Sequence, residues 1–295
     1  MKIDPKEIPF SQLHGLLLGA IGPRPIAFAS TVDNEGNVNL SPFSFFNVFS
    51  ANPPILIFSP ARRGRDNTTK HTYENVMSHP EVVISVVSYD MVQQMSLAST
   101  EYERGVDEFI KSGFTKKASE LVKPPRVFES PVSFECTVNE VKKLGDKGGA
   151  GNLIICEVLL MHVSDDVLDP SGKIDPHKID LVARMGGDWY TRAKTDAFEV
   201  EKPLAIKGIG VDALPKPIRY SSILTGNHLG KLGNVEQIPS NEEVSAFSGE
   251  PEIQAILTAL TGDPDQQSDE LHKLAAFFLD RGEVNKAWKT LLQEV

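Results

Sequence analysis

The sequence predicts a mainly β fold, a barrel or sandwich of antiparallel strands with short flanking helices, followed by a C-terminal helical extension. Short apolar runs rich in β-branched residues recur up to about residue 163, and turn sequences separate them. Helical periodicity is weak in this part of the chain, whereas a parallel sheet would alternate strands with helices. From about residue 240 the apolar residues take a helical spacing instead.

The first strands are predicted at residues 25–32 and 38–41. The segment PIAFASTV (25–32) is apolar, small and partly β-branched, which suits a strand buried on both faces. DNEGN (33–37) is a turn sequence, and the chain returns through VNLS. We expect a β-hairpin here.

Further strands are expected in the four apolar segments that follow. They are residues 54–58, 81–88, 132–141 and 153–163. The glycine-rich segment NEVKKLGDKGGAG (139–151) is typical of a hairpin loop that joins the last two. Phe134, Cys136 and Val138 alternate with polar residues, as in a sheet with one face in water.

Helices in the first two-thirds of the chain are expected to be short and few. One begins near Thr72 and runs through Met77, and another covers about residues 89–98. Residues 203–239 contain several prolines and glycines with little periodicity, which predicts an extended, arm-like connection.

The C-terminal segment is predicted to be helical. Ser240 and Glu243 form a capping box, and helices are expected over residues 252–260, 271–279 and 283–292. We interpret the segment as a terminal helical hairpin that covers the barrel or a partner subunit; half of a helical repeat is the alternative. The predicted domains are a β domain, the arm and the helical segment, at residues 1–202, 203–239 and 240–295.

Composition and charge exclude several classes of function. The 295 residues include 30 Lys and Arg against 40 Asp and Glu, and this net charge of −10 argues against general nucleic-acid binding. No run of about 18 apolar residues occurs, so we expect no membrane span. The N-terminal segment lacks the features of a signal peptide, so we expect a cytoplasmic protein. Cys136 and Cys156 agree with a reducing compartment; they either face each other across a hairpin or are two reduced core thiols.

The sequence offers no signature of a nucleophile or a metal site. It has no G-x-S-x-G, and its seven histidines are scattered without a metal-binding spacing. GIGVDA (208–213) matches the dinucleotide fingerprint G-x-G-x-x-A, but LPKP follows, and prolines prevent the helix that the fingerprint needs. We therefore expect a turn there. His162 lies in a predicted strand, where it either faces a pocket or is a satisfied strand residue.

A basic cluster, RRGRDNTTKHTYEN, covers residues 62–75. Four cations lie within nine positions of this acidic chain, and they are Arg62, Arg63, Arg65 and Lys70. Arginine pairs bidentately with phosphate, the threonine hydroxyls at 68, 69 and 72 can donate to it, and a helix capped by Thr72 would add backbone N–H groups. The cluster predicts either a phosphate site or a solvated basic loop.

A second segment, SPFSFFNVFS (41–50), combines four phenylalanines with small polar residues directly after a strand. It is either a hydrophobic loop that packs into the core or the wall of a flat slot. Such a slot, with backbone N–H groups and serine hydroxyls on its rim, suits a planar heteroaromatic ligand.

Three blocks of the chain resemble, in order and approximate spacing, the flavin reductase-like family with the FMN-binding split-barrel fold. The blocks are GPRPIAFASTVDNEGNVNLSPFSFFNVFSANPPILIFS, then RRGRD with KHTYEN, then SPVSFECTVNEVKKLG with GNLIICEVLLMHVSDDVLD. The resemblance runs from about Gly22 to Tyr190. It implies a homodimer of six-stranded antiparallel split barrels with FMN at the subunit interface.

The resemblance also implies which residues bind the flavin. Those along the isoalloxazine edge are Ala29, Ser30 and Thr31, and those lining the ring and the ribityl chain are Ser41, Pro42, Phe43, Ser44 and Phe45. The family's basic segment is usually K-D-T-x-x-N, and its counterparts around the phosphate are Lys70, Thr72 and Asn75, with Arg63 upstream. His71 replaces the common Asp and adds positive charge near the phosphate. RMGGDWY (184–190) is similar to the family's ending R-x-G-G-x-x-Y, which approaches the flavin or the partner chain.

The resemblance implies an FMN-binding oxidoreductase, an NAD(P)H-dependent flavin reductase in which the nicotinamide passes hydride to flavin N5. That step needs no acid or base from the protein, so no catalytic side chain is expected. A monooxygenase or another electron-acceptor protein would receive the electrons. Two alternatives stay open: a flavoredoxin-like electron-transfer protein reduced by a protein partner, and a structural or regulatory split-barrel protein without flavin. Relatives of pyridoxamine-phosphate oxidase share the broad fold, but the three blocks are more similar to the flavin reductase-like branch.

Overall fold

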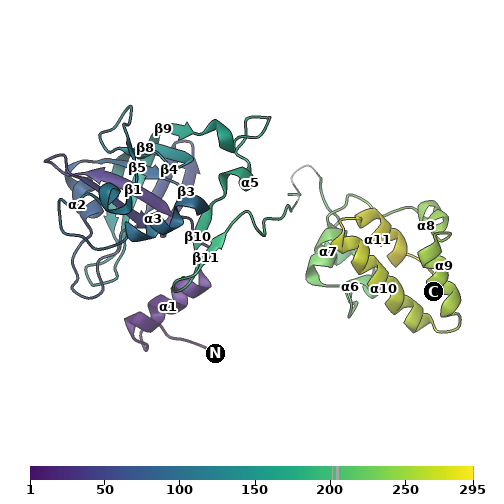
Figure 1. Cartoon of the computed structure of the whole chain (residues 1–295). Helices are drawn as coiled ribbons and strands as arrows, with labels where there is room; N and C mark the ends of the chain where they lie inside the picture. The colour runs from purple at the N-terminus through teal and green to yellow at the C-terminus, as the bar shows by residue number, and fades with distance from the viewer. Residues whose placement is uncertain (201, 204–205, 295) are drawn as a thin grey trace. The chain divides into compact units, whose positions relative to one another are not determined.

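The computed structural model describes residues 1–200, 202–203 and 206–294 and divides into two compact units, Met1–Phe198 and Glu199–Val295 (Figure 1). The first unit is mainly β and the second is helical. Among the described residues, none of the helices is long and apolar enough to cross a membrane.

One seven-stranded sheet forms the first unit, in the order β2-β1-β5-β8-β9-β4-β3, and every neighbouring pair is antiparallel. The strands are β1 (Ala27–Val32), β2 (Val38–Phe43), β3 (Phe46–Ala51), β4 (Pro54–Phe58), β5 (Glu81–Ser85), β8 (Val132–Lys143) and β9 (Asn152–Val163). The mainly β class is confirmed, but the sheet has seven strands where six were expected. The additional strand is β3, an edge strand whose side chains are largely exposed, so it lacks the pattern of a buried strand.

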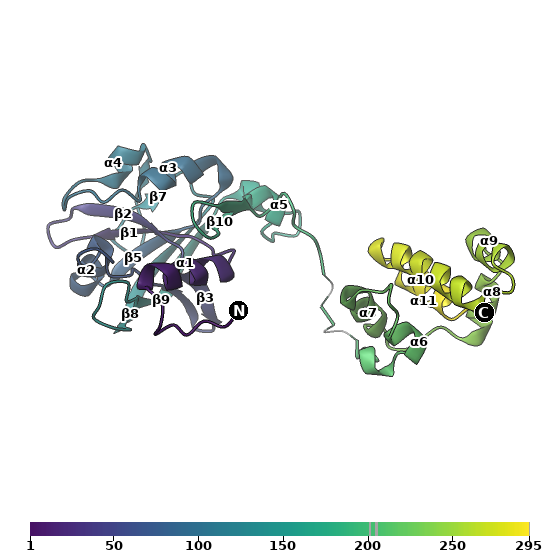
Figure 2. The same cartoon turned by 90° about the horizontal axis from the view of Figure 1, so that it is seen from below.

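The sheet curls because its two edge strands are consecutive in the chain. Only Ser44 and Phe45 link the end of β2 to the start of β3, a span of at most about 11 Å. The two edges of the sheet therefore approach each other at this link, where the Ser59 N–H donates to the Phe45 carbonyl (2.9 Å). Figures 1 and 2 show the curved sheet from two directions.

Strand β1 contributes to two buried clusters, because successive side chains point to opposite faces of a strand. Phe28 belongs to one cluster with Leu40 and Phe109, and Ala29 belongs to the other with Ile84. All six residues of β1 are buried. The sequence-based prediction of a strand covered on both faces is therefore confirmed.

Both cysteines are free thiols in the second of these clusters. Cys136 on β8 and Cys156 on β9 are fully buried, and burial raises the pKa of the Cys136 thiol to about 12. A thiol with so high a pKa forms little thiolate at neutral pH, so these cysteines serve as small apolar core residues.

Short helices and two minor strand pairs complete the first unit. The helical segments are α1 (Phe10–Ala20), α2 (His71–Ser78), η1 (Tyr89–Met91), α3 (Val92–Leu97), α4 (Glu108–Ser112), η2 (Asp165–Val167) and α5 (Pro176–Ile179). The minor pairs are β6 (Lys116–Lys117) with β7 (Arg126–Val127) and β10 (Val182–Arg184) with β11 (Tyr190–Arg192). The helices expected at residues 72–77 and 89–98 correspond to α2 and to η1 with α3. Helix α2 packs against β1 and β2.

The β8–β9 hairpin is longer than the sequence predicted. Strand β8 continues to Lys143, so the first residues of the expected loop at 139–151 belong to the ladder. Two irregularities in the β8–β9 register, at Glu135/Cys136 and Val138/Glu140, interrupt the simple alternation.

The second unit is a bundle of short helices around one apolar core. Its helices are η3 (Val211–Ala213), α6 (Lys216–Arg219), α7 (Gly226–Gly233), α8 (Asn241–Phe247), α9 (Pro251–Ala259), α10 (Pro264–Asp280) and α11 (Val284–Leu291). The predicted capping box of Ser240 and Glu243 is present at the start of α8. Trp288 lies in the core, and its Nε1–H donates to the Leu232 carbonyl (3.2 Å).

The structure corrects the expectation of an extended arm over residues 203–239. This stretch contains η3, α6 and α7, and it buries Leu214, Ile218 and Leu232 in the core of the second unit. Helix α7 begins with a capping box formed by Thr225 and His228. Helices of three to eight residues are too short to show a helical apolar period, which is why the sequence pattern concealed them.

The segment GIGVDA is a turn, as the sequence predicted. Gly210 has a φ of +82°, and a Cβ on Gly208 would lie 2.6 Å from the Gly233 carbonyl oxygen. The last three residues of the segment form the 3₁₀ helix η3, which is too short to hold a pyrophosphate.

Candidate functional site

Two buried hydrogen bonds tie the start of α2 to the first hairpin. Asn39 Nδ2 on β2 donates to Thr72 Oγ1 (2.9 Å), and Asn75 Nδ2 donates to Thr31 Oγ1 on β1 (3.1 Å). All four side chains are buried. Because a buried amide or hydroxyl is costly without a partner, these bonds fix the first turn of α2 against the hairpin.

Helix α2 has an uncapped N-terminus. It begins at His71, and its N-cap residue Lys70 makes no side-chain cap. Thr72 is therefore the second residue of the helix and not the cap that the sequence predicted, since its hydroxyl accepts from Asn39. The Tyr73 and Glu74 N–H groups donate to the Lys70 carbonyl (3.0 and 3.2 Å). The N–H groups of His71 and Thr72 and the positive end of the helix dipole are left for another partner.

Three cations of the basic cluster converge on one carboxylate, that of Glu101. Arg63 Nε and Lys70 Nζ both approach Glu101 Oε1, at 2.9 and 3.2 Å, and Arg65 Nη2 pairs with Glu101 Oε2. Partial burial opposes ionisation of Glu101, but the hydrogen bonds from Lys70 and Arg63 hold its pKa below the ordinary value. Arg62 does not take part; its guanidinium donates to the Asn67 side chain (2.7 Å) and to the Asn67 carbonyl.

These groups line a small pocket, the basic pocket, between the basic cluster, β2 and the segment that follows α3. Four of the predicted residues line it, namely Ser41, Arg63, Lys70 and Thr72, and two carboxylates, Glu101 and Glu108, line it as well. The pocket has a volume of about 20 Å³, which is room for about one water molecule. The structure thus places Arg63 and Lys70, which were predicted to bind the phosphate, next to β2, which was predicted to line the flavin ring.

Glu108 is the second carboxylate of the basic pocket, and it is fixed. It is buried at the start of α4, and its Oε2 accepts from the Leu40 N–H on β2 (2.9 Å). Burial raises the pKa of this carboxyl above its ordinary value. Its partner is a backbone group and not one of the cations.

The environment of His71 at the start of α2 disfavours its charged form, contrary to the expectation that it adds positive charge. Burial lowers the pKa of its imidazole, and the nearby charges of Arg104, Arg63 and Lys70 lower it further. The cations beside it therefore supply the positive charge of the site alone.

The predicted residues of β1 lie directly beside those of β2, because the ladder sets Ala29 opposite Ser41. Ala29, Ser30 and Thr31 are buried. Thr31 is satisfied by Asn75, whereas the buried Ser30 Oγ has no hydrogen-bond partner among the described residues. A buried hydroxyl without a partner is unusual. Because successive side chains of a strand point to opposite faces, Ser30 lies on the face of Phe28 and Leu40, away from Ser41.

The predicted residues at the β2–β3 link divide into core and surface. Phe43 is buried, and its ring packs against Phe58 with centroids 5.4 Å apart, so it is a core residue. Phe45 is exposed, and Pro42 and Ser44 are half-buried. The core reading is therefore confirmed for Phe43, and the slot reading of the other residues stays a prediction.

Arg24 is a buried residue that the sequence analysis did not single out. Its guanidinium donates to the Leu18 carbonyl (2.7 Å), the Ile21 carbonyl and the Met185 carbonyl (2.8 Å), and its Nε lies 3.5 Å from Ser44 Oγ. It thereby joins the end of α1, the RMGGDWY turn and the β2–β3 link. The only sequence signal is its place in the segment GPRP before the first strand.

A larger cavity, of about 230 Å³, opens beside η1 and α3; of the segments that the resemblance implicates, only RMGGDWY reaches it, through Tyr190. Tyr89, Val182 and Tyr190 form apolar walls, and the Arg192 guanidinium lies over the Tyr89 ring at 3.8 Å. Asp180 accepts two hydrogen bonds from Arg192 (2.8 and 2.6 Å) and also pairs with Lys194 (3.2 Å). The tyrosine walls of the cavity suit a flat apolar group.

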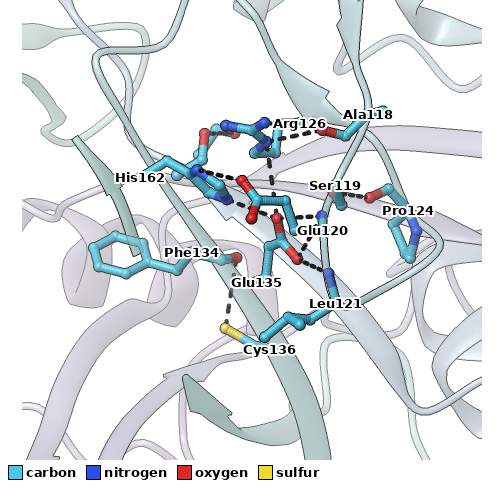
Figure 3. Close-up of polar contacts among 12 residues, drawn as sticks. Ala118, Ser119, Glu120, Leu121, Pro124, Arg126, Phe134, Glu135, Cys136 and His162 are labelled. Atoms are coloured by element: carbon cyan, nitrogen blue, oxygen red, sulfur yellow. Dashed lines mark hydrogen bonds and ion pairs between the residues drawn. The ribbon is translucent and has the colours of Figure 1, made fainter. Parts of the chain in front are cut away.

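His162 on β9 belongs to a polar network with Glu135 on the neighbouring strand β8 (Figure 3). The Glu135 carboxylate on β8 is fully buried and accepts from the N–H groups of Glu120 (2.9 Å) and Leu121 (2.6 Å), and His162 Nε2 lies 2.7 Å from its Oε1. Arg126 Nε lies 3.9 Å away. His162 is therefore a satisfied strand residue, and its network holds the segment before β7 against the sheet.

Comparison with known proteins covers the first unit. A family model described as a flavin reductase like domain matches residues 20–177. An uncharacterised protein of Aquifex aeolicus is 37% identical over 193 residues, which are 65% of this chain and 96% of that protein.

Solved structures agree with this match. Nitrilotriacetate monooxygenase component B from Bacillus cereus is similar with a TM-score of 0.64 and 28% identity, over 68% of this chain and 98% of that chain. A candidate flavin reductase with a split barrel domain from Shewanella frigidimarina is similar with a TM-score of 0.58 and 25% identity, over 68% and 100% of the two chains.

Proposed function

This chain belongs to the flavin reductase-like family, and from that membership we propose that it is an FMN-binding oxidoreductase that uses NAD(P)H as its electron donor. The observation that carries the proposal is the basic pocket, in which Arg63 and Lys70 lie beside Ser41 and the uncapped start of α2. A flavin-related oxidoreductase follows from the family. FMN is our inference from the site, and NAD(P)H as the donor is our inference from the family resemblance.

The charges of the basic pocket favour FMN over an unphosphorylated flavin. A phosphate monoester carries about 1.5 to 2 negative charges at neutral pH and has three strong acceptor oxygens. Arg63 and Lys70 would pair with it, and the N–H groups of His71 and Thr72 at the start of α2 would donate to it.

A bound flavin would supply the redox chemistry, by taking hydride from a nicotinamide, and the protein would supply binding and orientation. Strands β1 and β2 are held by buried clusters and by the bonds to α2, so the proposed binding residues are rigid. No side chain has to move a proton in hydride transfer, which agrees with the use of Glu135 and His162 in a structural network.

We also propose that the chain forms a homodimer of split barrels. Helix α1 has the sequence FSQLHGLLLGA, yet none of its residues is buried in the single chain. On the edge strand β3, Val48 and Phe49 are more than half exposed. Apolar surface of this extent on a helix and on a sheet edge is typical of an interface.

A partner enzyme that consumes the reduced flavin completes the proposal. The similar Bacillus cereus protein is named as one component of a monooxygenase, which supports a monooxygenase or another acceptor protein as the partner. The cytoplasmic location expected from the sequence stays a prediction.

The proposal is tested by the absorbance spectrum of the purified full chain. We expect the flavin band to shift and its fluorescence to change when FMN is added, with weaker binding of riboflavin, and we expect NADH or NADPH to bleach the bound flavin without air. A chain that binds neither flavin would contradict the proposal. A chain that binds FMN but is bleached by neither donor would indicate an electron carrier reduced by a protein partner.

A further inference from the structure

The Glu101 carboxylate occupies the place that an anionic ligand would need. Both of its oxygens are used: Oε1 by Arg63 and Lys70, and Oε2 by Arg65. Arg63 is itself held by Thr68 Oγ1 (3.0 Å) and the Thr69 carbonyl, so its guanidinium points at Glu101 in a fixed direction. The arrangement is that of an oxyanion bound by converging donors, with the oxyanion supplied by the chain itself.

The basic pocket cannot accept a phosphate group while Glu101 stays in place. Its volume of about 20 Å³ admits about one water molecule, whereas a phosphate brings a phosphorus atom and its oxygens. A phosphate beside the carboxylate would also place like charges in contact. Glu101 therefore has to leave before the cations can bind a ligand.

Glu101 is able to leave, and Glu108 is not. Glu101 lies between α3 and α4, outside any helix or strand, and about a third of its side chain (31%) is exposed to water. Water can therefore solvate the Glu101 carboxylate when it leaves the cations, although Arg63 is the more buried partner, with 14% of its side chain exposed. Glu108 is buried and bonded to the Leu40 N–H, so it remains a fixed wall of the basic pocket.

We propose that Glu101 is a displaceable internal counter-ion that occupies the phosphate subsite and sets how tightly phosphorylated flavin is bound. The inference rests on the proposed function and adds a specificity residue to it. A phosphate dianion replaces a monoanion at the cations, so the exchange is favourable, but each binding event includes the release of Glu101 to water. FMN can bind only to the fraction of the chain in which Glu101 has moved away. Its apparent affinity is therefore lowered, and exchange of the flavin is favoured.

The experiment compares Glu101→Gln with the full natural chain in titrations with FMN and with riboflavin. We expect Glu101→Gln to tighten FMN binding roughly 5- to 20-fold, because a neutral amide no longer competes for the cations. Riboflavin affinity should not change. FMN release, followed by a chase with excess riboflavin, should slow by a similar factor. Glu103→Gln is the matched control, since Glu103 is exposed on the same segment, and it should behave like the natural chain.

The outcomes separate this inference from the proposed function. If the natural chain and Glu101→Gln bind FMN equally well, Glu101 is not a competitor, although the FMN site stands. If riboflavin binding tightens as much as FMN binding, the effect does not act through the phosphate, and the inference is also wrong. If none of the chains binds FMN, the proposed function fails and the inference fails with it. Should Glu101→Gln fold poorly by circular dichroism, Glu101→Ala serves as the second variant with the same expectations.

Discussion

Two cations of one loop, Lys70 and Arg62, differ in a way that tests the phosphate site residue by residue. Lys70 lines the basic pocket and pairs with Glu101, whereas Arg62 is turned to Asn67. We expect Lys70→Glu to weaken FMN binding roughly 10- to 100-fold, because it removes a charged hydrogen bond and adds a repelling charge. Riboflavin binding should be unaffected. The measurement is a fluorescence titration with both flavins.

Arg62→Glu is the control for that substitution, because it makes the same change of net charge on the same loop. It should weaken FMN binding by a few-fold at most, as expected for a charge that does not touch the ligand. Equal losses in both variants would mean that FMN senses only the overall charge of the loop, and the assignment of Lys70 to the phosphate would be wrong.

His71 gives the first unit a pH dependence in the absence of ligand. Burial lowers the pKa of the imidazole, and Arg104, Arg63 and Lys70 lower it further, so the folded chain binds this proton less readily than the unfolded chain. The contribution of His71 to stability is therefore present above the ordinary histidine pKa of about 6.5 and is lost as the pH falls below it. Between about pH 7.5 and 5.5, the melting temperature of His71→Gln should fall by about 1–2 °C less than that of the natural chain.

Differential scanning calorimetry of the flavin-free chain measures this difference. His14→Gln is a suitable control because His14 is exposed on α1, and its pH profile should follow that of the natural chain. Parallel profiles for the natural chain and His71→Gln would show that His71 keeps an ordinary pKa in the fold.

Glu135 is the residue on which the network of Figure 3 depends. Its carboxylate is fully buried and accepts from two backbone N–H groups and from His162. Glu135→Ala leaves the two N–H groups and His162 without this acceptor, so we expect a loss of about 3–5 kcal/mol in the free energy of unfolding. Urea unfolding followed by circular dichroism measures it. A loss below about 1 kcal/mol, the size of a surface change, would contradict this role.

At the scale of elements, the sequence predicted those strands whose burial or turn chemistry is local. The β1–β2 hairpin is an example: the Asp33 carboxylate accepts from the N–H groups of Glu35 and Asn37 (both 2.9 Å), which is the turn that DNEGN predicts. Strand β1 was predictable because all its residues are apolar or small and buried.

Elements that depend on distant partners were not predictable from local pattern. Strand β3 is an edge strand whose exposed aromatic residues resemble a loop, and only its pairing with β4 defines it. Arg24 donates to the Met185 carbonyl, far along the chain, and Glu101 pairs with Arg63 on a different loop. Neither has a local motif, so the sequence could not identify them. The basic cluster could be identified because its cations are neighbours in the chain.

Strand β3 also carries a prediction about assembly. Val48 and Phe49 are exposed by 62% and 63% of their surface, and a homodimer would cover such residues. We expect Phe49→Glu to weaken the dimer by at least tenfold, because it places a charge in an apolar interface. Light scattering coupled to size-exclusion chromatography, over a range of concentrations, measures the dissociation. Ile110→Glu on α4 is the control, since Ile110 is also exposed but lies on another element. A natural chain that is monomeric at all concentrations would contradict the homodimer.

At the scale of the whole molecule, the two units have separate cores. The two clusters that contain β1 use residues between Ile26 and Val182, with Tyr190 packed against one of them, and the core of the second unit uses residues from Ile209 onward. The family match, residues 20–177, also lies within the first unit. Each unit therefore has what a domain needs to fold by itself.

This separation predicts that a chain ending at Phe198 keeps the flavin site. Every residue that lines the basic pocket lies between Asn39 and Glu108, well inside the first unit. We expect the shortened chain to melt cooperatively and to bind FMN within about twofold of the affinity of the full chain, since no lining residue is removed. The measurement is calorimetry together with the FMN titration, and Lys70→Glu in the shortened chain controls for non-specific binding. If the shortened chain folds but its affinity for FMN falls tenfold or more, the helical unit contributes to the site. The assignment of flavin binding to the first unit alone is then wrong.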